Sequence, residues 1–245
     1  MKRLIFTICT GRCGTQLLAE RLAEVPGVSS LHEGEPNFFN ILPKVRINPS
    51  EAVKFWKDVK LPTINKTNNP IYVETSHLFC KGFMEGLLEI NIIPDIILLS
   101  RPHREVASSL YRLDCIPGRN EKGRGWLLSP DEFGVLPVKN WQEMNNYQLC
   151  FWYCLEIERR QIEAAKTISS LGGRVIKTTL NEITTRSGMI NTINELNLPS
   201  PKPLTKLKWD LFSNRRVNQK EWHLAKNIPG NLLDVYERGV YERLV

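Results

Sequence analysis

The sequence has few cysteines and histidines, and neither residue type is spaced as a metal site requires. None of the six cysteines forms a Cys-x-x-Cys pair, and the four histidines lie far apart, at positions 32, 77, 103 and 223. Cys150 and Cys154 are four residues apart among the apolar residues Leu149, Phe151 and Trp152, as core residues of a helix are. We therefore expect reduced, structural cysteines and no metal.

Long apolar segments and linkers are also missing. There is no apolar run of 18 residues, and the first apolar run begins within five residues of Met1, which leaves no room for a secretory signal. We therefore expect a cytoplasmic protein without a membrane partner. With 245 residues and 42% hydrophobic content, the chain can bury one sizeable core, so residues 1–245 are expected to form a single domain.

The chain has a net positive charge, but its charged residues are not concentrated in one segment. The net charge of +7 suits a polyanionic ligand, and the charged residues are spread from Arg3 to Arg243. No RNA-binding or zinc-finger pattern accompanies them. Nucleic acid is therefore not an expected partner.

A loop with two glycines follows the apolar run Leu4 to Phe6 and leads into a helical pattern. Gly11 and Gly14 permit tight turning, Arg12 adds a fixed positive charge, and the N–H groups of residues 13–16 would open the helix toward an anion. The loop is not a Walker A motif, because only two residues separate its glycines and no lysine precedes the hydroxyl. It is a candidate phosphate-binding turn, and an ordinary strand-to-helix turn is the alternative.

A second strand, turn and helix are predicted over residues 95–112. The apolar run ends at Ser100, and Pro102 stands near the first helical position, where a missing N–H costs nothing. Arg101 then lies at the carboxyl end of the strand, and Ser109 lies about two turns up the helix at about 1.5 Å per residue, so both side chains could hold one anion.

The remaining pattern alternates strands and helices, which predicts an α/β protein with a parallel sheet. Further strands are expected over residues 28–31, 71–74 and 174–178, and a long amphipathic helix over residues 141–169. The segment 114–140 is rich in Gly and Pro and too long for a plain connection, so it is either a disordered excursion or a lid over an acceptor pocket.

These motifs resemble those of the sulfotransferases that use 3′-phosphoadenosine 5′-phosphosulfate (PAPS). The family's 5′-phosphosulfate loop has a basic residue, a small residue, Gly and Thr, matched here by Arg12-Cys13-Gly14-Thr15, and its 3′-phosphate motif is matched by Arg101 and Ser109. The resemblance implies a three-layer, P-loop NTPase-like fold around a central parallel sheet. It also implies that the donor is bound by the loop from Gly11 to Gln16 and that no metal takes part.

A third match concerns the catalytic base. In the glycan branch of this family the base is a Glu separated by two residues from a Phe-Phe pair, and Glu35, before Phe38 and Phe39, is the candidate that resembles it. The two phenylalanines could give the carboxylate partly dry surroundings and raise its pKa. His32 and Glu33 remain rival bases.

The segment 71–79 is similar to the family's Glu-Lys-Ser segment, with Glu74 and Ser76 retained and Thr75 in place of the lysine. Ser76 is therefore a candidate catalytic residue, and the positive charge of the missing lysine has to come from Arg12 alone, from Lys81 or from His77. Glu74 is either a direct participant or a buried acid that organises the first loop.

Near the C-terminus, Arg215 and Arg216 occupy the place of the family's basic loop over the 3′-phosphate, although the family's tripeptide is absent. The resemblance thus implies a PAPS-dependent transferase that moves a sulfuryl group to a hydroxyl, or to an amine or guanidine, of a metabolite, natural product or sugar. A P-loop kinase, in which Glu74 would help to hold Mg²⁺, and a non-catalytic adenine-nucleotide-binding module are the alternatives. The acceptor's identity and the oligomeric state do not follow from the sequence.

Overall fold

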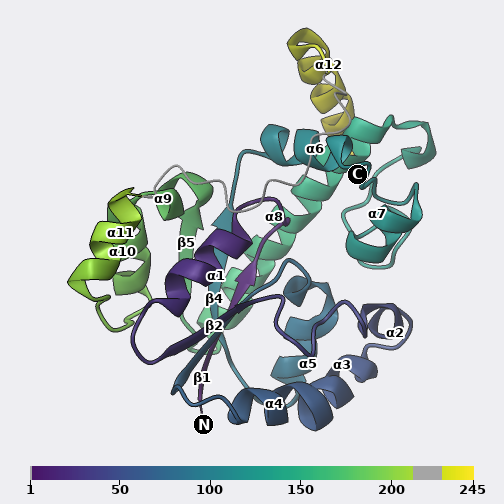
Figure 1. Cartoon of the computed structure of the whole chain (residues 1–245). Coiled ribbons are helices and arrows are strands. Elements are labelled where there is room, and N and C mark those ends of the chain that lie inside the picture. Colours follow the sequence, from purple (N-terminus) through teal and green to yellow (C-terminus); the bar gives the residue numbers. More distant parts are fainter. Residues whose placement is uncertain (1, 212–227) are drawn as a thin grey trace. The chain divides into compact units, whose positions relative to one another are not determined.

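The computed structural model describes residues 2–211 and 228–245, which group into two compact units (Figure 1). The first unit holds the described residues of 1–100 and 161–219, and the second holds those of 101–160 and 220–245. That the chain forms a single domain stays a prediction.

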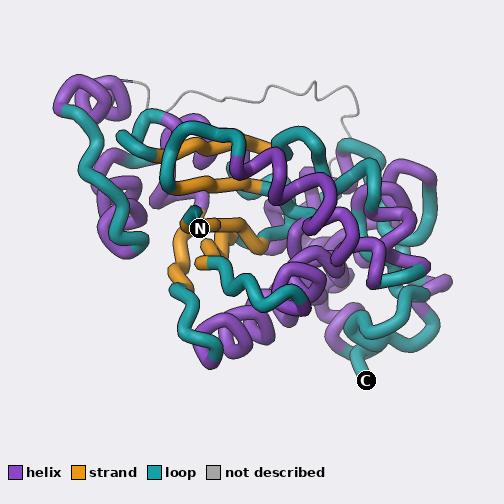
Figure 2. Tube along the Cα trace, turned by 90° about the horizontal axis from the view of Figure 1, so that it is seen from below, coloured by secondary structure: helices purple, strands orange, loops and turns teal. Residues whose placement is uncertain are grey.

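The first unit is built on a sheet of five parallel strands in the order β2-β3-β1-β4-β5. Figure 2 draws the strands in orange and the helices in purple. The strands are β1 (Arg3–Ile8), β2 (Val28–His32), β3 (Ile71–Thr75), β4 (Asp95–Ser100) and β5 (Val175–Thr179). Every neighbouring pair is parallel. The predicted α/β class with a central parallel sheet is therefore confirmed, and all five strands lie where apolar runs predict them.

Helices cover both faces of this sheet because successive side chains of a strand point to opposite sides. On one face, Ile5 of β1 joins a core with Leu18 and Leu22 of α1 (Thr15–Ala23) and Met189 of α10 (Arg186–Glu195). This layer also contains the helices α9 (Leu180–Thr184) and α11 (Pro203–Leu211).

On the other face, Phe6 of β1 stacks on Phe79 with ring centroids 4.3 Å apart and meets the edge of Trp56 at 5.5 Å. Residues 42–65 and 79–89, on either side of β3 in the sequence, supply this layer. Its elements are α2 (Leu42–Ile47), α3 (Ser50–Phe55), a π-helical stretch (Trp56–Lys60), α4 (Leu61–Asn65), a second π-helical stretch (Phe79–Phe83) and α5 (Met84–Glu89). The chain thus has the three layers that were expected.

The second unit is helical. It contains α6 (His103–Arg112), α7 (Glu121–Trp126), a 3-10 turn (Trp141–Glu143), the first part of α8 (Asn146–Ser170) and α12 (Gly230–Tyr241). The long helix predicted over residues 141–169 therefore begins later than expected, after the 3-10 turn. Among the helices of the described residues, none is long and apolar enough to cross a membrane.

Residues 114–140 are folded against their neighbours within this unit. Asn120 caps α7 by accepting a hydrogen bond from the N–H of Gly123 at 2.8 Å, and Arg119 donates to the carbonyl of Met144 at 2.6 Å. Gly123 packs so closely that a Cβ there would lie 1.8 Å from the carbonyl oxygen of Ile116. The structure therefore decides against a disordered excursion, and the role of a lid stays a prediction.

Candidate active site

The loop between β1 and α1 turns through left-handed backbone conformations. φ is +74° at Gly11, +57° at Arg12 and +92° at Gly14. Glycine adopts this region readily, whereas a residue with a Cβ does so rarely. Gly14 is the N-cap of α1 and offers no side-chain cap to the N–H groups of the first turn. A helix N-terminus opened in this way attracts anions, because its N–H groups and its dipole both favour negative charge.

Buried side chains of this loop attach it to the core. Cys9 and Cys13 are fully buried, and a hydrogen bond with Cys13 together with burial raises the pKa of the Cys9 thiol well above its usual value. Thr15 is buried too, and its carbonyl accepts a hydrogen bond from Thr75 Oγ1 at 2.9 Å. The side chain of Cys13 belongs to the core, so only its backbone can serve the ligand role expected of it.

Polar side chains gather around His77, which packs directly against the loop. A Cβ on Gly11 would lie 3.2 Å from the Cγ of the His77 ring, so the glycine permits this close approach. Lys81 Nζ lies 3.2 Å from His77 Nδ1, and Glu33 Oε1 lies 3.6 Å from His77 Nε2. Because an ammonium group can only donate, Nδ1 is the acceptor, and the neutral ring carries its proton on Nε2, toward Glu33.

The surroundings of His77 determine whether its ring carries a positive charge. Burial lowers the pKa of His77 well below its usual value, and the positive charges of Lys81, His32 and Arg12 lower it further. His77 is therefore neutral near pH 7, while Lys81 is buried beside it. His77 therefore does not supply the positive charge of the missing lysine, and its supply by Arg12 alone or by Lys81 stays a prediction.

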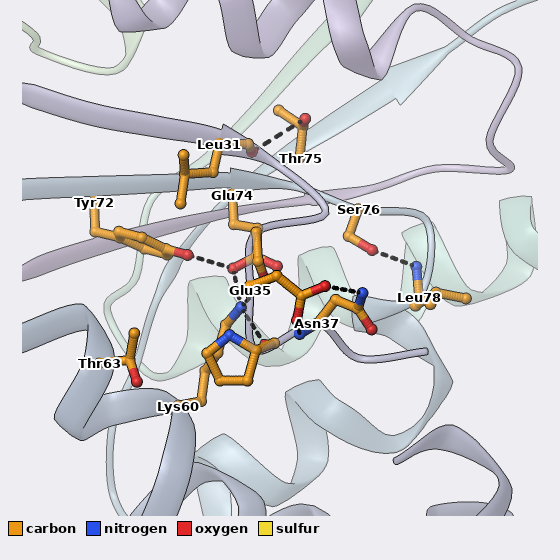
Figure 3. A network of polar contacts seen from close by, with 12 residues as sticks. Leu31, Glu35, Asn37, Lys60, Thr63, Tyr72, Glu74, Thr75, Ser76 and Leu78 are labelled. Atoms are coloured by element: carbon orange, nitrogen blue, oxygen red, sulfur yellow. Dashed lines mark hydrogen bonds and ion pairs between the residues drawn. The ribbon is translucent and has the colours of Figure 1, made fainter. Parts of the chain in front are cut away.

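Glu35 follows β2 and is exposed. Figure 3 shows its side chain next to that of Asn37. Its carboxylate accepts hydrogen bonds from the backbone N–H of Asn37 at 3.1 Å and from Asn37 Nδ2 at 2.8 Å. Phe38 is buried in the aromatic layer, with its ring centroid 4.5 Å from that of Phe83. The expectation that Phe38 and Phe39 would give Glu35 partly dry surroundings is therefore wrong: Phe38 is in the core, Phe39 is half-buried, and Glu35 stays exposed.

His32 and Ser76 lie at the carboxyl ends of β2 and β3. His32 is exposed, and its Nδ1 is 2.9 Å from the carbonyl oxygen of Thr75. Ser76 is buried; its N–H donates to Thr7 Oγ1 at 2.9 Å, and its own hydroxyl accepts from the N–H of Leu78 at 3.1 Å. These bonds give Ser76 a part in holding the turn, and its catalytic role stays a prediction.

Glu74 is buried in β3 and is engaged by other side chains. Its Oε2 is 2.7 Å from Lys60 Nζ and accepts a hydrogen bond from the Tyr72 hydroxyl at 2.5 Å. Of the two alternatives for Glu74, the structure agrees with a buried, hydrogen-bonded acid, but the partners of its Oε2 are Lys60 and Tyr72 and not residues of the first loop. Among the described residues, no group of three or more His, Cys, Asp or Glu side chains is placed to hold a metal ion.

The predicted 3′-phosphate residues lie at the start of α6 and within it. The guanidinium Nε of Arg101 donates to Glu105 at 2.8 Å, and Ser109 is buried two turns up the helix. Burial and the positive charge of Arg101 lower the pKa of Arg112, so a second guanidinium lies near the first. Arg215 and Arg216 lie outside the described residues.

Sequence reasoning missed Lys60 and Arg112. Arg112 follows Ser109 by three residues and therefore lies on the same helix face, a spacing that could have identified it. Lys60 stands among Lys57, Asp58 and Val59 and has the local pattern of a surface lysine. Nothing near it in the sequence indicates burial.

Comparisons with known proteins place this geometry in a known fold. No family model and no curated protein sequence matches the chain. Among solved structures, it is similar to a sulfotransferase domain from the curacin biosynthetic pathway, with a TM-score of 0.58 and 14% identity over 99% of this chain and 90% of that one. It is also similar to a sulfotransferase domain from the Synechococcus PCC 7002 olefin synthase, with a TM-score of 0.53 and 14% identity over 98% of this chain and 96% of that one. The chain therefore has a sulfotransferase-like fold.

Proposed function

We propose that this chain is a sulfotransferase that moves a sulfuryl group from PAPS to a hydroxyl, amine or guanidine group of a small acceptor. The observation that carries the proposal is the loop of residues 11–15. Its left-handed backbone opens the N-terminus of α1, and Arg12 and Lys81 are the cations near it. The sulfotransferase-like fold supports the same reading.

The residues of the loop suit a phosphosulfate group. Gly14 leaves the first-turn N–H groups of α1 without a side-chain cap, and these groups can donate to anionic oxygens without rearrangement. Lys81 is buried, so solvent screens its charge weakly. The donor supplies the sulfuryl group and leaves as 3′,5′-adenosine diphosphate.

Glu35 is the proposed general base. Its exposed carboxylate can reach an acceptor from solvent and take the proton as the acceptor atom bonds to sulfur. Arg12, Lys81 and the helix N-terminus would stabilise the negative charge that passes to the leaving phosphate as its bond to sulfur breaks. Arg101 and Ser109 are proposed to bind the 3′-phosphate.

The structure gives the kinase alternative little support. A kinase of the P-loop type uses a loop lysine and an acidic group for Mg²⁺. Here the loop has no lysine, and the charge of the Glu74 carboxylate is already paired with that of Lys60 through Oε2.

The test is an activity screen with the purified protein. Labelled PAPS is incubated with pooled alcohols, amines and sugars, with and without a chelator, and ATP with Mg²⁺ is run in parallel. We expect acceptor-dependent transfer from PAPS that the chelator leaves unchanged. Transfer from ATP that the chelator abolishes would establish the kinase, and tight binding of 3′,5′-adenosine diphosphate without turnover would establish a non-catalytic module.

A further inference from the structure

Two opposite charges are buried together beneath the loop that carries Glu35. Lys60, at the end of the π-helical stretch, and Glu74, in β3, have side chains that are 1% and 0% exposed, and their Nζ and Oε2 atoms are 2.7 Å apart. Tyr72 donates its hydroxyl proton to the same carboxylate oxygen (Figure 3). The three residues come from two separate segments of the chain and meet in the interior of the first unit.

Burying this pair is costly for the fold. Burial lowers the pKa of Lys60 and raises that of Glu74, which means that both charged forms are disfavoured by their surroundings. Apolar residues of similar size often stabilise a protein as well as a buried ion pair does. Stability alone therefore does not explain why a lysine and a glutamate occupy these positions.

The remaining contacts of Lys60 point to a role at the loop. Its ammonium group lies 2.7 Å from the carbonyl oxygen of Gly34 and 2.9 Å from that of Pro36, and it lies 4.9 Å from the centroid of the Phe38 ring. An ammonium group has three N–H donors. One is directed to Glu74 and two are directed to the carbonyls on either side of Glu35.

We propose that Lys60, held by Glu74, is the positioning residue for the catalytic base. The ammonium group fixes the backbone before and after Glu35, and Asn37 holds the carboxylate itself. Glu35 can then be exposed to an acceptor and still be held in one orientation. This inference rests on the proposed function, in which Glu35 is the base.

The test uses the full chain and four variants. Lys60→Met removes the ammonium group and keeps most of the apolar volume, and Glu74→Gln removes its counterion. The double variant Lys60→Met/Glu74→Gln removes both charges and leaves an amide oxygen to accept from Tyr72. Lys57→Met is the matched control, because Lys57 is an exposed lysine in the same π-helical stretch.

Four quantities are measured for each protein. They are the hydrogen exchange of residues 33–40, the urea midpoint, the binding of 3′,5′-adenosine diphosphate, and kcat with the best acceptor. In Lys60→Met we expect exchange of this segment to be at least about 10-fold faster and kcat to fall about 10- to 100-fold, with nucleotide binding unchanged within about twofold. Lys57→Met should match the wild-type protein.

The double variant separates positioning from stability. Because it leaves no unpaired buried charge, its urea midpoint should rise above that of Lys60→Met, whereas its kcat should stay low because the two carbonyls still lack their donor. Recovery of kcat together with the midpoint would overturn the proposal, and so would wild-type exchange at residues 33–40 in Lys60→Met. If the wild-type protein transfers no sulfuryl group to any acceptor, the proposed function fails, and the exchange measurement alone decides whether Lys60 holds the loop.

Discussion

Glu35 is exposed, and both of its carboxylate oxygens accept hydrogen bonds from Asn37. As the proposed base it has to take a proton from the acceptor, which a glutamine side chain cannot do. Glu35→Gln keeps the size and polarity of the side chain. We expect the acceptor-dependent rate to fall about 10²- to 10⁴-fold in a steady-state assay, with little change in the binding of 3′,5′-adenosine diphosphate. Glu33→Gln and His32→Ala are the comparison variants. A rate that survives in Glu35→Gln and is lost in one of the other two would move the base to that residue.

His77 makes stability depend on pH. Its pKa is lowered in the folded chain, first by burial and then by Lys81, His32 and Arg12, whereas in the unfolded chain it is about 6.5. Below about pH 6.5 the unfolded state therefore binds a proton that the folded state does not. As the pH is lowered, the free energy of unfolding decreases by up to about 1.4 kcal/mol per pH unit. Above that pH both states are neutral at this position and the dependence disappears.

Urea unfolding between about pH 5 and 7.5 measures this effect, with His77→Gln as the variant without a titrating group. We expect the wild-type protein to lose more stability on acidification than the variant does. Equal slopes for the two proteins would show that His77 keeps its ordinary pKa in the folded state.

At the scale of elements, the start of α6 is where the 3′-phosphate is expected. Arg101→Ala removes a guanidinium whose side chain is 25% exposed, and calorimetry should show that 3′,5′-adenosine diphosphate binds more weakly by about 1.5 to 3 kcal/mol, the size of a lost charge-assisted hydrogen bond. The loss should be smaller for 5′-AMP, which has no 3′-phosphate. Arg104→Ala, three residues further along the chain in α6, is the charge-matched control, since Arg104 pairs with Asp234 and Glu237. Equal losses for the two nucleotides in Arg101→Ala would remove the assignment.

The elements were predictable from the sequence where the local pattern decides the structure. The strands have continuous apolar runs bounded by turns, and the loop from Gly11 to Gly14 has the two glycines that its left-handed backbone requires. The long helix was placed correctly except at its start, where residues 141–143 form a 3-10 turn. The ordered structure of residues 114–140 was not predicted, because it depends on the packing of Gly123 against Ile116 and on the capping of α7 by Asn120.

The site was less predictable because its partners come from distant segments. Lys60 meets Gly34 and Pro36 only after α2, α3 and the π-helical stretch have packed on the sheet. Phe38 looks like a neighbour of Glu35 in the sequence, but burial in the aromatic layer stabilises it more than contact with an exposed acid would. The local spacing of residues in the sequence predicts neither the contacts of Lys60 nor the burial of Phe38.

At the scale of the whole molecule, the class of the fold follows from the alternation of strands and helices, but the order of the strands in the sheet does not. β1 lies in the middle, between β3 and β4. In the sequence, α1, β2 and residues 42–65 lie between β1 and β3. β2 pairs with β3 and β4 with β5, which are consecutive strands, whereas β1 pairs with the third and fourth strands and not with β2, the next one. Parallel neighbours require such long connections.

The central place of β1 bears on how the chain is made. Its register pairs Arg3 with Ile71 and Ile5 with Asp95, so both of its neighbours leave the ribosome long after β1 itself. Until then the apolar side chains of Leu4, Ile5 and Phe6 and the strand's backbone groups lack their final partners. At about 5 to 20 residues per second, that interval lasts several seconds, during which an unpaired apolar strand is prone to aggregate. β1 of the nascent chain therefore stays without one of its two neighbours until β4 has been synthesised.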